Sequence, residues 1–375
     1  MYIIETKESV NNGQLFFLKR YAVRDGVFIE PDKKFESKAE KIDLSSYLVM
    51  PGLVDIHCHG RGGVDVMDCS VEAIQELSRL KVLEGVTSFC PTTVTAPLEK
   101  TMDAIRAINA ARELGGKGAK ILGAFLEGPY INPTYKGAHP ENFIRPVNLS
   151  EIKKLTETGG VASVIIAPEL ENALETIKFL TKNGINARIG HTAATYEEAK
   201  KGCEAGADIF VHTYNAMSPL NHREPGAVGA AMTLDAYAEL IFDNIHVHKA
   251  AAKILYGARG KRRVILVTDC MRAGGLSDGE YNLGELDVIV KDGVSRLKSG
   301  ALAGSTATLM SCVKNAHEAL GIKIEDAVLM ATQNPSEALD LNVGSLDVNK
   351  SADLIAIDKD FNVKFVMIAG KIIIR

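Results

Sequence analysis

The sequence predicts an α/β protein, a distorted (β/α)8 TIM barrel with a small β-sandwich domain built from both chain ends. Eight apolar, β-type runs between residues 53 and 269 alternate with amphipathic helical stretches. This alternation indicates a parallel sheet covered on both faces, and eight such units are the number that closes a barrel. Shorter β-type runs stand at both ends of the chain, and neither end has enough of them to fold well alone.

Short strands are expected in the first 50 residues, separated by charged turns, at 2–4, 14–18, 21–23, 26–29 and 47–50. They predict that residues 1–50 form the N-terminal part of the small β domain. The barrel is expected over 51–342, with strands at 53–57, 87–93, 121–127, 161–168, 185–191, 209–212, 239–243 and 263–269. Residues 343–375 should form the C-terminal part of the small domain, since β-type runs return at 342–347, 352–358 and 361–374.

Helical stretches lie between most of the predicted strands, and two more follow the last one, at 71–84, 98–114, 150–158, 171–183, 196–205, 248–257, 302–320 and 325–339. Thr195 and Glu198 form a complete capping-box signature at the start of one of them. The Gly- and Ala-rich stretch after Arg223 is only ambiguously helical. An open doubly wound sheet is the alternative, but it calls for a glycine-rich phosphate loop after the first strand. At that position the chain has His57-Cys58-His59.

Composition excludes several classes of partner. The 375 residues carry a net charge of −4 with no run of like charge, so neither nucleic acid nor an anionic membrane is expected as a partner. No apolar run approaches the roughly 18–20 residues that cross a bilayer, and the N-terminus lacks the apolar core of a secretory signal. The six cysteines are scattered without a Cys-x-x-Cys pair, which is typical of reduced thiols in a cytoplasmic enzyme.

Residues with metal-binding chemistry stand at the C-terminal ends of the predicted strands. His57 and His59 should point to the same side of an extended chain, although a lone His-x-His pair is a weak signal. Glu127, His191, His212 and Asp269 end four other runs, and in a barrel these ends form one rim. Each could alone be a cap or a core residue. Together they predict a site for Zn²⁺, Fe²⁺ or Mn²⁺, which accept nitrogen and carboxylate ligands.

Short motifs surround these residues and extend over essentially the whole chain: Pro-Gly-Leu-Val-Asp-Ile-His-Cys-His-Gly at 51–60, Leu-Glu-Gly-Pro at 126–129, Lys-Gly-Ala-His at 136–139, Gly-His-Thr at 190–192, His-Thr-Tyr-Asn-Ala-Met at 212–217, Arg-Glu-Pro-Gly at 223–226, Asp-Asn-Ile-His at 243–246, Val-Thr-Asp at 267–269, Leu-Ala-Gly-Ser at 302–305 and Asn-Pro at 334–335. In these motifs the sequence resembles the amidohydrolase superfamily, and within it the enzymes that deacetylate N-acetylglucosamine 6-phosphate. The resemblance implies removal of the acetyl group, giving glucosamine 6-phosphate and acetate.

The resemblance also implies the roles of individual residues. Glu127, His191 and His212 should hold the principal divalent metal, and His57 with His59 a second one. Some members lack the two histidines and use one metal, so this chain should bind one or two. The substrate is expected against Ala138, His139, Asn215, Ala216, Arg223, Asp243, His246, Leu302, Ala303 and Gly304. Members form dimers, which implies a homodimer or a dimer of dimers, with some phosphate contacts from the neighbouring subunit.

The chemistry of these residue types agrees with that assignment. A bound metal lowers the pKa of water towards about 7 and polarises a carbonyl. Asp269 should take the proton of the attacking water as general base and then deliver it to the departing amine as general acid. His139 should orient the acetyl carbonyl or a sugar hydroxyl. Arg223 and His246 offer donors to the 6-phosphate, although Arg223 could instead form a surface ion pair with Glu224.

Three other functions remain open from the sequence. The nearest is the same reaction on N-acetylgalactosamine 6-phosphate, which differs only in the orientation of one hydroxyl. A second is hydrolysis of a cyclic amide by a dihydroorotase-like enzyme, but such enzymes usually bridge two metals with a modified lysine, and here Glu127 occupies a ligand position. The third is a non-catalytic amidohydrolase-fold scaffold, which should have lost metal ligands or the catalytic aspartate.

Overall fold

The computed structural model describes all residues, 1–375. Its central sheet is a parallel barrel in which every predicted strand has a counterpart: β8 (Leu53–Cys58), β11 (Val86–Thr93), β12 (Lys120–Ile121) with β13 (Ala124–Leu126), β14 (Val161–Ile165), β15 (Asn186–Ile189), β16 (Ile209–Phe210), β17 (Tyr237–Ile241) and β18 (Val264–Val267). The hydrogen-bonded order runs from β8 through β11, β13, β14, β15, β16 and β17 to β18, with β12 also paired to β11. The predicted (β/α)8 fold class is confirmed.

Backbone hydrogen bonds between β8 and the end of β18 close the barrel. The Asp269 N–H donates to the His57 carbonyl at 2.9 Å, and the His59 N–H donates to the Cys270 carbonyl at 2.9 Å. Cys58 and Cys270 form a parallel bridge at the same point. The closure is therefore made by the segments that carry candidate metal ligands, which fixes those segments relative to each other.

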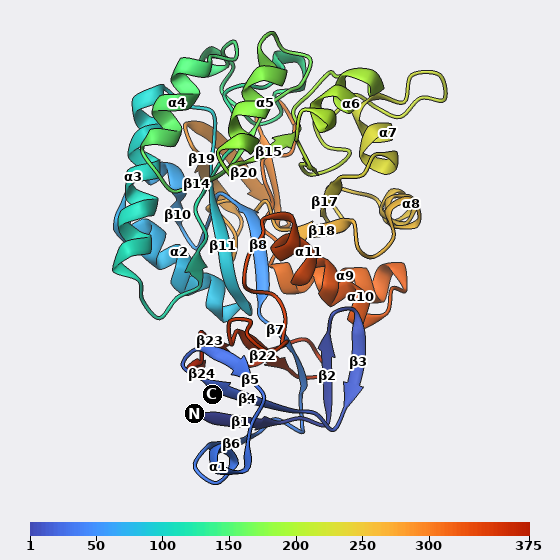
Figure 1. Cartoon of the computed structure of the whole chain (residues 1–375). Helices are drawn as coiled ribbons and strands as arrows, with labels where there is room; N and C mark the ends of the chain where they lie inside the picture. The colour runs from blue at the N-terminus through green and yellow to red at the C-terminus, as the bar shows by residue number, and fades with distance from the viewer.

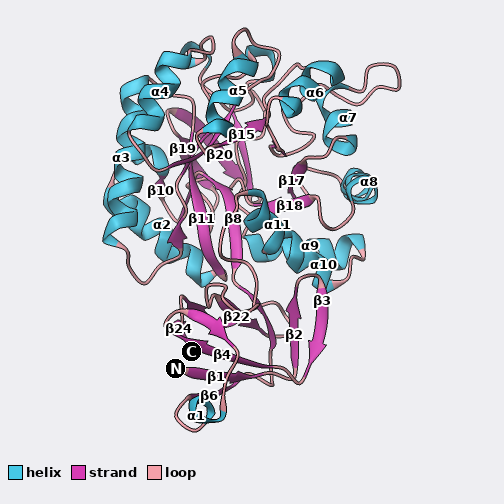
Figure 2. Cartoon of the chain, in the orientation of Figure 1, coloured by secondary structure: helices cyan, strands magenta, loops and turns pink.

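Helices surround the strands on the outside of the barrel (Figures 1 and 2). They are α2 (Val71–Leu83), α3 (Leu98–Leu114), α4 (Leu149–Glu157), α5 (Ala173–Lys182), α6 (Tyr196–Glu204), α7 (Gly226–Thr233), α8 (Lys249–Arg259), α9 (Leu309–Leu320), α10 (Ile324–Met330) and α11 (Gln333–Ala338). The ambiguous stretch after Arg223 is thus helical in α7. One core of 72 buried residues joins the strands to these helices.

The limits of the two helices predicted after the last barrel strand were wrong. The expected helix 302–320 begins only at Leu309, where the Thr308 hydroxyl accepts a hydrogen bond from the Ser311 N–H as an N-cap. The expected helix 325–339 is two helices, because Thr332 leaves the helical region with φ −133° and ψ −81°. None of the helices combines the length and the apolar character needed to span a bilayer.

A small antiparallel sheet between β18 and α9 was not predicted. Its strands are β19 (Gly279–Leu283), β20 (Leu286–Lys291) and β21 (Val294–Leu297). The strands are short and carry many polar, exposed side chains, and of their apolar residues only Leu283, Val288 and Val290 are buried. Two very short strands, β9 (Gly60–Arg61) and β10 (Val64–Asp65), form a further hairpin after β8.

The two chain ends form a sandwich of two sheets at one end of the barrel, as predicted (Figure 1). One sheet has the order β5-β4-β1-β6 and the other β24-β23-β22-β7-β2-β3. Their bounds are β1 (Tyr2–Glu5), β2 (Glu8–Asn11), β3 (Gln14–Phe17), β4 (Arg20–Arg24), β5 (Val27–Ile29), β6 (Glu40–Asp43), β7 (Leu48–Pro51), β22 (Leu354–Ile357), β23 (Val363–Ile368) and β24 (Lys371–Ile374), with the short helix α1 (Lys33–Glu36).

β7 pairs antiparallel with β22, which joins the N-terminal and C-terminal segments in one sheet. Between the two sheets, Ile4, Val23 and Phe28 pack in one buried cluster with Val49 and Phe365. The strand expected at 342–347 does not form, whereas β2 and β6 were not expected. The domain limits at 50/51 and 342/343 stay a prediction.

Candidate metal centre

The structure brings the six predicted chemical residues to one rim of the barrel. His57 lies in β8 and His59 directly follows that strand, while Glu127 directly follows β13. His191, His212 and Asp269 are each the second residue after the end of a strand, namely β15, β16 and β18. All six residues are buried. They span more than 200 positions of sequence, and only barrel closure makes them neighbours.

Three of these residues share an unusual backbone conformation. His191, His212 and Asp269 have φ angles of +46°, +32° and +48°. Residues other than glycine rarely adopt a positive φ. This backbone conformation costs on the order of 1–3 kcal/mol per residue, and such residues cluster at functional sites. Here the sharp turn at each strand end holds the side chain over the same rim.

Glu127 lies between two pairs of histidines. Its Oε1 is 3.1 Å from His212 Nε2 and 3.4 Å from His191 Nε2, and those two nitrogens are 3.0 Å apart. On the other side, Oε1 is 3.3 Å from His57 Nε2, and Oε2 is 3.1 Å from His59 Nε2. One carboxylate could therefore contribute to two neighbouring metal positions.

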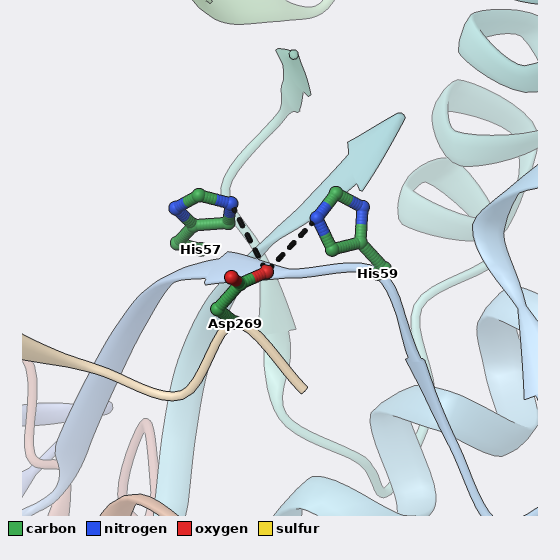
Figure 3. Close-up of side chains that lie close together, drawn as sticks. All are labelled: His57, His59 and Asp269. Atoms are coloured by element: carbon green, nitrogen blue, oxygen red, sulfur yellow. Dashed lines mark ion pairs between the residues drawn. The ribbon is translucent and has the colours of Figure 1, made fainter. Parts of the chain in front are cut away.

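Asp269 faces the first-strand histidines. Its Oδ1 is 3.1 Å from His59 Nε2 and 3.5 Å from His57 Nε2. Figure 3 shows the two imidazole rings on either side of this carboxylate, with a nitrogen of each directed at it. His57, His59 and Asp269 form one group able to hold a metal ion, and Glu127, His139 and His191 form another.

The hydrogen bonds of the outer ring nitrogens set the tautomers of three histidines. The Nδ1 atoms of His57, His59 and His191 each face an acceptor: the Glu239 carboxylate at 3.1 Å, the Thr92 carbonyl at 3.1 Å and the Tyr135 carbonyl at 2.8 Å. Nδ1 therefore donates its proton outward, which leaves the Nε2 lone pair directed at the centre, as a metal ligand requires. His57 Nε2 is buried without a hydrogen-bond partner, which fits a metal position.

His139 has the opposite arrangement. The Thr95 N–H donates to His139 Nδ1 at 3.2 Å, and the Thr95 hydroxyl lies 2.8 Å from the same atom. Because a backbone N–H can only donate, Nδ1 is the acceptor and the proton of the neutral ring is on Nε2. That Nε2 is 3.4 Å from Glu127 Oε2. His139 thus fits a hydrogen-bond donor in the cavity better than it fits a metal ligand.

The charges of the protein groups at this centre favour bound positive charge. Burial alone would lower the pKa of His59, but Asp269 and Glu127 outweigh it and raise this pKa to about 9. Burial opposes the ionised form of Asp269 as well, yet His57 and His59 hold its pKa at about 2. Burial and the neighbouring His139 lower the pKa of His191 to about 4. The carboxylates are therefore ionised and attract either protons or a metal ion.

A cavity of about 350 Å³ opens beside this cluster, within the roughly 300–1,000 Å³ usual for small-molecule sites. Most predicted site residues line it: His59, Glu127, Ala138, His139, His191, His212, Asn215, Ala216, His246, Asp269, Leu302 and Gly304. His57, Asp243 and Ala303 are not in the lining. A second cavity, of about 600 Å³ near Arg61 and Lys314, contains no histidine.

The predicted phosphate donors differ in position. His246 lines the cavity, and its Nδ1 lies 2.7 Å from the Asp243 carboxylate, which orients the ring. Arg223 is exposed and lies outside the lining, with Nη1 2.9 Å from His222 Nε2. No ion pair joins Arg223 to Glu224. The cavity lining contains neither lysine nor arginine.

Six cavity residues were not among the predicted site residues. They are Val94, Thr134, Tyr135, Gly137, Leu283 and Ala301. Leu283 comes from the unpredicted antiparallel sheet. Gly137 has φ +54°, and a Cβ there would lie 3.1 Å from His191 Cε1, so a glycine leaves room for the His191 ring. Its place in the 136–139 motif was the available signal.

Comparison with known proteins agrees with the resemblance seen in the motifs. The model described as the Amidohydrolase family matches residues 48–373. An N-acetylglucosamine-6-phosphate deacetylase from Vibrio furnissii is 42% identical over 340 residues, covering 89% of this chain and 85% of that protein. An N-acetylgalactosamine-6-phosphate deacetylase from Escherichia coli O157:H7 is 40% identical over 330 residues, covering 87% of each.

Solved structures of similar proteins have the same fold over the full length. An N-acetylglucosamine-6-phosphate deacetylase from Thermotoga maritima matches with a TM-score of 0.91 at 33% identity, covering 100% of this chain and 99% of that one. A mutant of the Mycobacterium smegmatis enzyme in complex with N-acetyl-D-glucosamine-6-phosphate matches with a TM-score of 0.93 at 30% identity and the same coverage. The motifs, the barrel and these matches lead to one conclusion: the chain belongs to the amidohydrolase family.

Proposed function

We propose that this protein is a metal-dependent deacetylase that hydrolyses N-acetylglucosamine 6-phosphate to glucosamine 6-phosphate and acetate. The observation that carries the proposal is the cluster of Glu127, His191 and His212, whose inner atoms lie 3.0–3.4 Å apart beside a cavity lined by Asp269. Relatives of that name are 42% and 36% identical over most of the chain. The intact ligand set argues against a non-catalytic scaffold.

The metal-holding residues in this proposal are Glu127, His191 and His212 for the principal ion and His57 with His59 for a second. The ion would be Zn²⁺, Fe²⁺ or Mn²⁺, since the donors are imidazole nitrogens and carboxylate oxygens. When bound, the metal supplies a more acidic water and polarises the acetyl carbonyl. The outward Nδ1–H bonds of His57, His59 and His191 support this assignment, because they leave the inner nitrogens unprotonated.

Asp269 moves the proton in the proposed reaction. As a carboxylate it takes a proton from water while the water oxygen bonds to the acetyl carbon. It then gives this proton to the amide nitrogen as the carbon–nitrogen bond breaks, so that the sugar leaves as a neutral amine and the acetyl group as acetic acid, which loses its remaining proton to solvent and becomes acetate. A pKa of about 2, set by the competition between burial and the charges of His57 and His59, supports the ionised starting state.

His139 and the rim loops bind and orient the substrate. His139 donates from Nε2 to the acetyl carbonyl or to a sugar hydroxyl, since its Nδ1 is engaged by Thr95. We assign the sugar to the cavity lined by Ala138, Asn215, Ala216, Leu302 and Gly304. Ala303 connects the last two of these residues, and Asp243 orients His246. His246 and the backbone N–H of Ala216 would face the phosphate, whereas the Asn215 N–H donates to the His212 carbonyl at 3.0 Å.

Arg223 is the proposed cationic group of the phosphate site, but it lies outside the cavity lining. A phosphate dianion is best held by a guanidinium or ammonium group, and the lining offers none. We therefore propose a homodimer or a dimer of dimers in which an exposed arginine such as Arg223 reaches a phosphate site, in its own or the neighbouring subunit. Six free cysteines support a reducing, cytoplasmic location.

N-acetylgalactosamine 6-phosphate is the second candidate substrate, because the relative from Escherichia coli O157:H7 is 40% identical. The test is acetate release by the purified, metal-loaded protein from both sugar phosphates and from unphosphorylated N-acetylglucosamine. We expect the highest kcat/KM with N-acetylglucosamine 6-phosphate. A higher value with the galactosamine derivative would assign the protein to the second activity, and no acetate from either would refute both.

A further inference from the structure

A buried ion pair lies next to the metal centre and has no role in the reaction described above. It joins Arg188 of β15 to Glu239 of β17, with Nη1 2.7 Å from Oε1, and both side chains have 0% exposure. Arg188 also donates to the Ile56 carbonyl at 3.1 Å and to the Ser163 hydroxyl at 2.8 Å. Its guanidinium stacks 4.0 Å above the ring of Phe125. These contacts come from four strands and fix the guanidinium in place.

The second carboxylate oxygen of Glu239 faces the metal centre. Oε2 lies 3.1 Å from His57 Nδ1 and accepts a hydrogen bond from the His212 N–H at 3.2 Å. One oxygen thus contacts a residue of each proposed metal position. It binds the ring of His57 but only the backbone of His212, so its influence on imidazole orientation is confined to His57.

The outer nitrogen of His57 has a different kind of hydrogen-bond partner from those of His59 and His191. The outer nitrogens of His59 and His191 donate to neutral backbone carbonyls. His57 alone donates to a carboxylate, and its ring has no exposed surface. A carboxylate behind a histidine ligand fixes the tautomer and makes the inner nitrogen more basic, and removing such a partner typically costs about 10–100-fold in metal affinity.

A purely structural role explains this pair poorly. Desolvation of two fully buried charges is so costly that replacing such a pair with apolar residues is often neutral or stabilising. We propose that Glu239, anchored by Arg188, is a positioning residue that holds His57 Nε2 towards the second metal position and thereby sets the affinity of that position. The inference rests on the two-metal site of the proposed function.

The test titrates metal-free protein with Zn²⁺ by calorimetry, for wild type, Glu239→Gln and Glu239→Asp. Glu239→Asp keeps the charge that Arg188 needs but withdraws it from His57. Asp353→Asn is the matched control, because Asp353 is equally buried, pairs with Lys120 at 2.7 Å and lies at the junction with the β sandwich. If the Glu239→Gln variant does not fold because Arg188 is left unpaired, the double variant Glu239→Gln/Arg188→Met is used instead, since it removes both charges.

We expect two Zn²⁺ ions per wild-type chain. In the Glu239 variants the second should bind about 10–100-fold more weakly, while the first changes by no more than a few fold. Asp353→Asn should bind both ions as wild type does, whatever it loses in Tm. Unchanged affinity for both ions in Glu239→Asp, or an equal loss at both positions, would overturn the inference. Wild type that takes up one ion would also overturn it, whereas acetate release by that protein would leave the proposed deacetylase activity standing.

Discussion

The Nε2 atoms of His191 and His212 face each other at 3.0 Å, and both lie within 3.4 Å of Glu127 Oε1. The His191 proton is on Nδ1, because that atom donates to the Tyr135 carbonyl. Two imidazole nitrogens and a carboxylate oxygen directed at one point need a positive charge between them, either a proton or a metal ion. This relationship underlies the proposed hydrolase chemistry.

Asp269→Asn should separate proton transfer from metal binding. The amide keeps the shape of the side chain but cannot accept the proton of water, so we expect kcat to fall by several orders of magnitude with metal content unchanged. Steady-state acetate release and elemental analysis measure the two effects. Asp103→Asn, on the exposed surface of α3, is the control and should be fully active. Near-normal turnover in Asp269→Asn would remove this residue from the reaction.

His139→Phe, which removes the ring N–H, tests whether this histidine is a donor or a metal ligand. As a donor to the acetyl carbonyl, its loss should lower kcat about 10²–10³-fold, the usual effect of deleting one such hydrogen bond. Metal content should stay at the wild-type value. In the wild type, Thr95 leaves the proton of His139 on its inner nitrogen, and a protonated nitrogen cannot bind a metal. A variant that loses one ion per chain would make His139 a ligand instead.

Arg223→Ala should act on the phosphate alone. We expect KM for N-acetylglucosamine 6-phosphate to rise about 10–100-fold, the range of a lost charged hydrogen bond, with kcat/KM for unphosphorylated N-acetylglucosamine unchanged. Arg106→Ala is the matched control, since Arg106 is also exposed and pairs only with Asp103. An equal effect on the two substrates would place Arg223 outside the phosphate site.

Metal-free protein should lose stability as the pH rises from about 6.5 to about 9. The pKa of His59 is near 6.5 in the unfolded chain and about 9 in the fold, where Asp269 and Glu127 overcome the effect of burial. Its protonated form therefore stabilises the fold fully below pH 6.5, and this contribution, on the order of 1–3 kcal/mol, is lost through pH 9. Thermal unfolding at both pH values, with and without Zn²⁺, measures it; an equal or higher Tm at pH 9 in the metal-free protein would contradict it.

Much of the barrel could be predicted because its signals are local. Each strand is an apolar run of the right length, and the side chains with chemistry follow these runs in the sequence, so barrel topology alone places Glu127, His191, His212 and Asp269 together. Strand ends were less predictable. The positive φ of His191 and His212 depends on packing around the rim, which no sequence window records.

The parts that could not be predicted depend on long-range contacts. The sequence predicted Glu239 only as the first residue of a strand. Its contacts could not be predicted, because its partners His57 and Arg188 are 182 and 51 positions away. In the sheet that contributes Leu283 to the cavity, β20 alternates buried and exposed side chains, and Asp292-Gly293 follows it as a hairpin signal that was not recognised in the sequence. Arg223 shows the opposite limit: its motif predicted a phosphate contact, and the structure places the side chain on the exposed surface, outside the cavity lining.

Elemental analysis of wild type and Glu127→Gln, after dialysis against metal-free buffer, tests the central claim most directly. Glu127 faces all four candidate histidine ligands at 3.1–3.4 Å. We predict one or two equivalents of Zn, Fe or Mn per wild-type chain and a loss of at least one equivalent in the variant. Active wild-type protein without bound metal, or a Glu127→Gln variant that retains the full complement, would contradict the account.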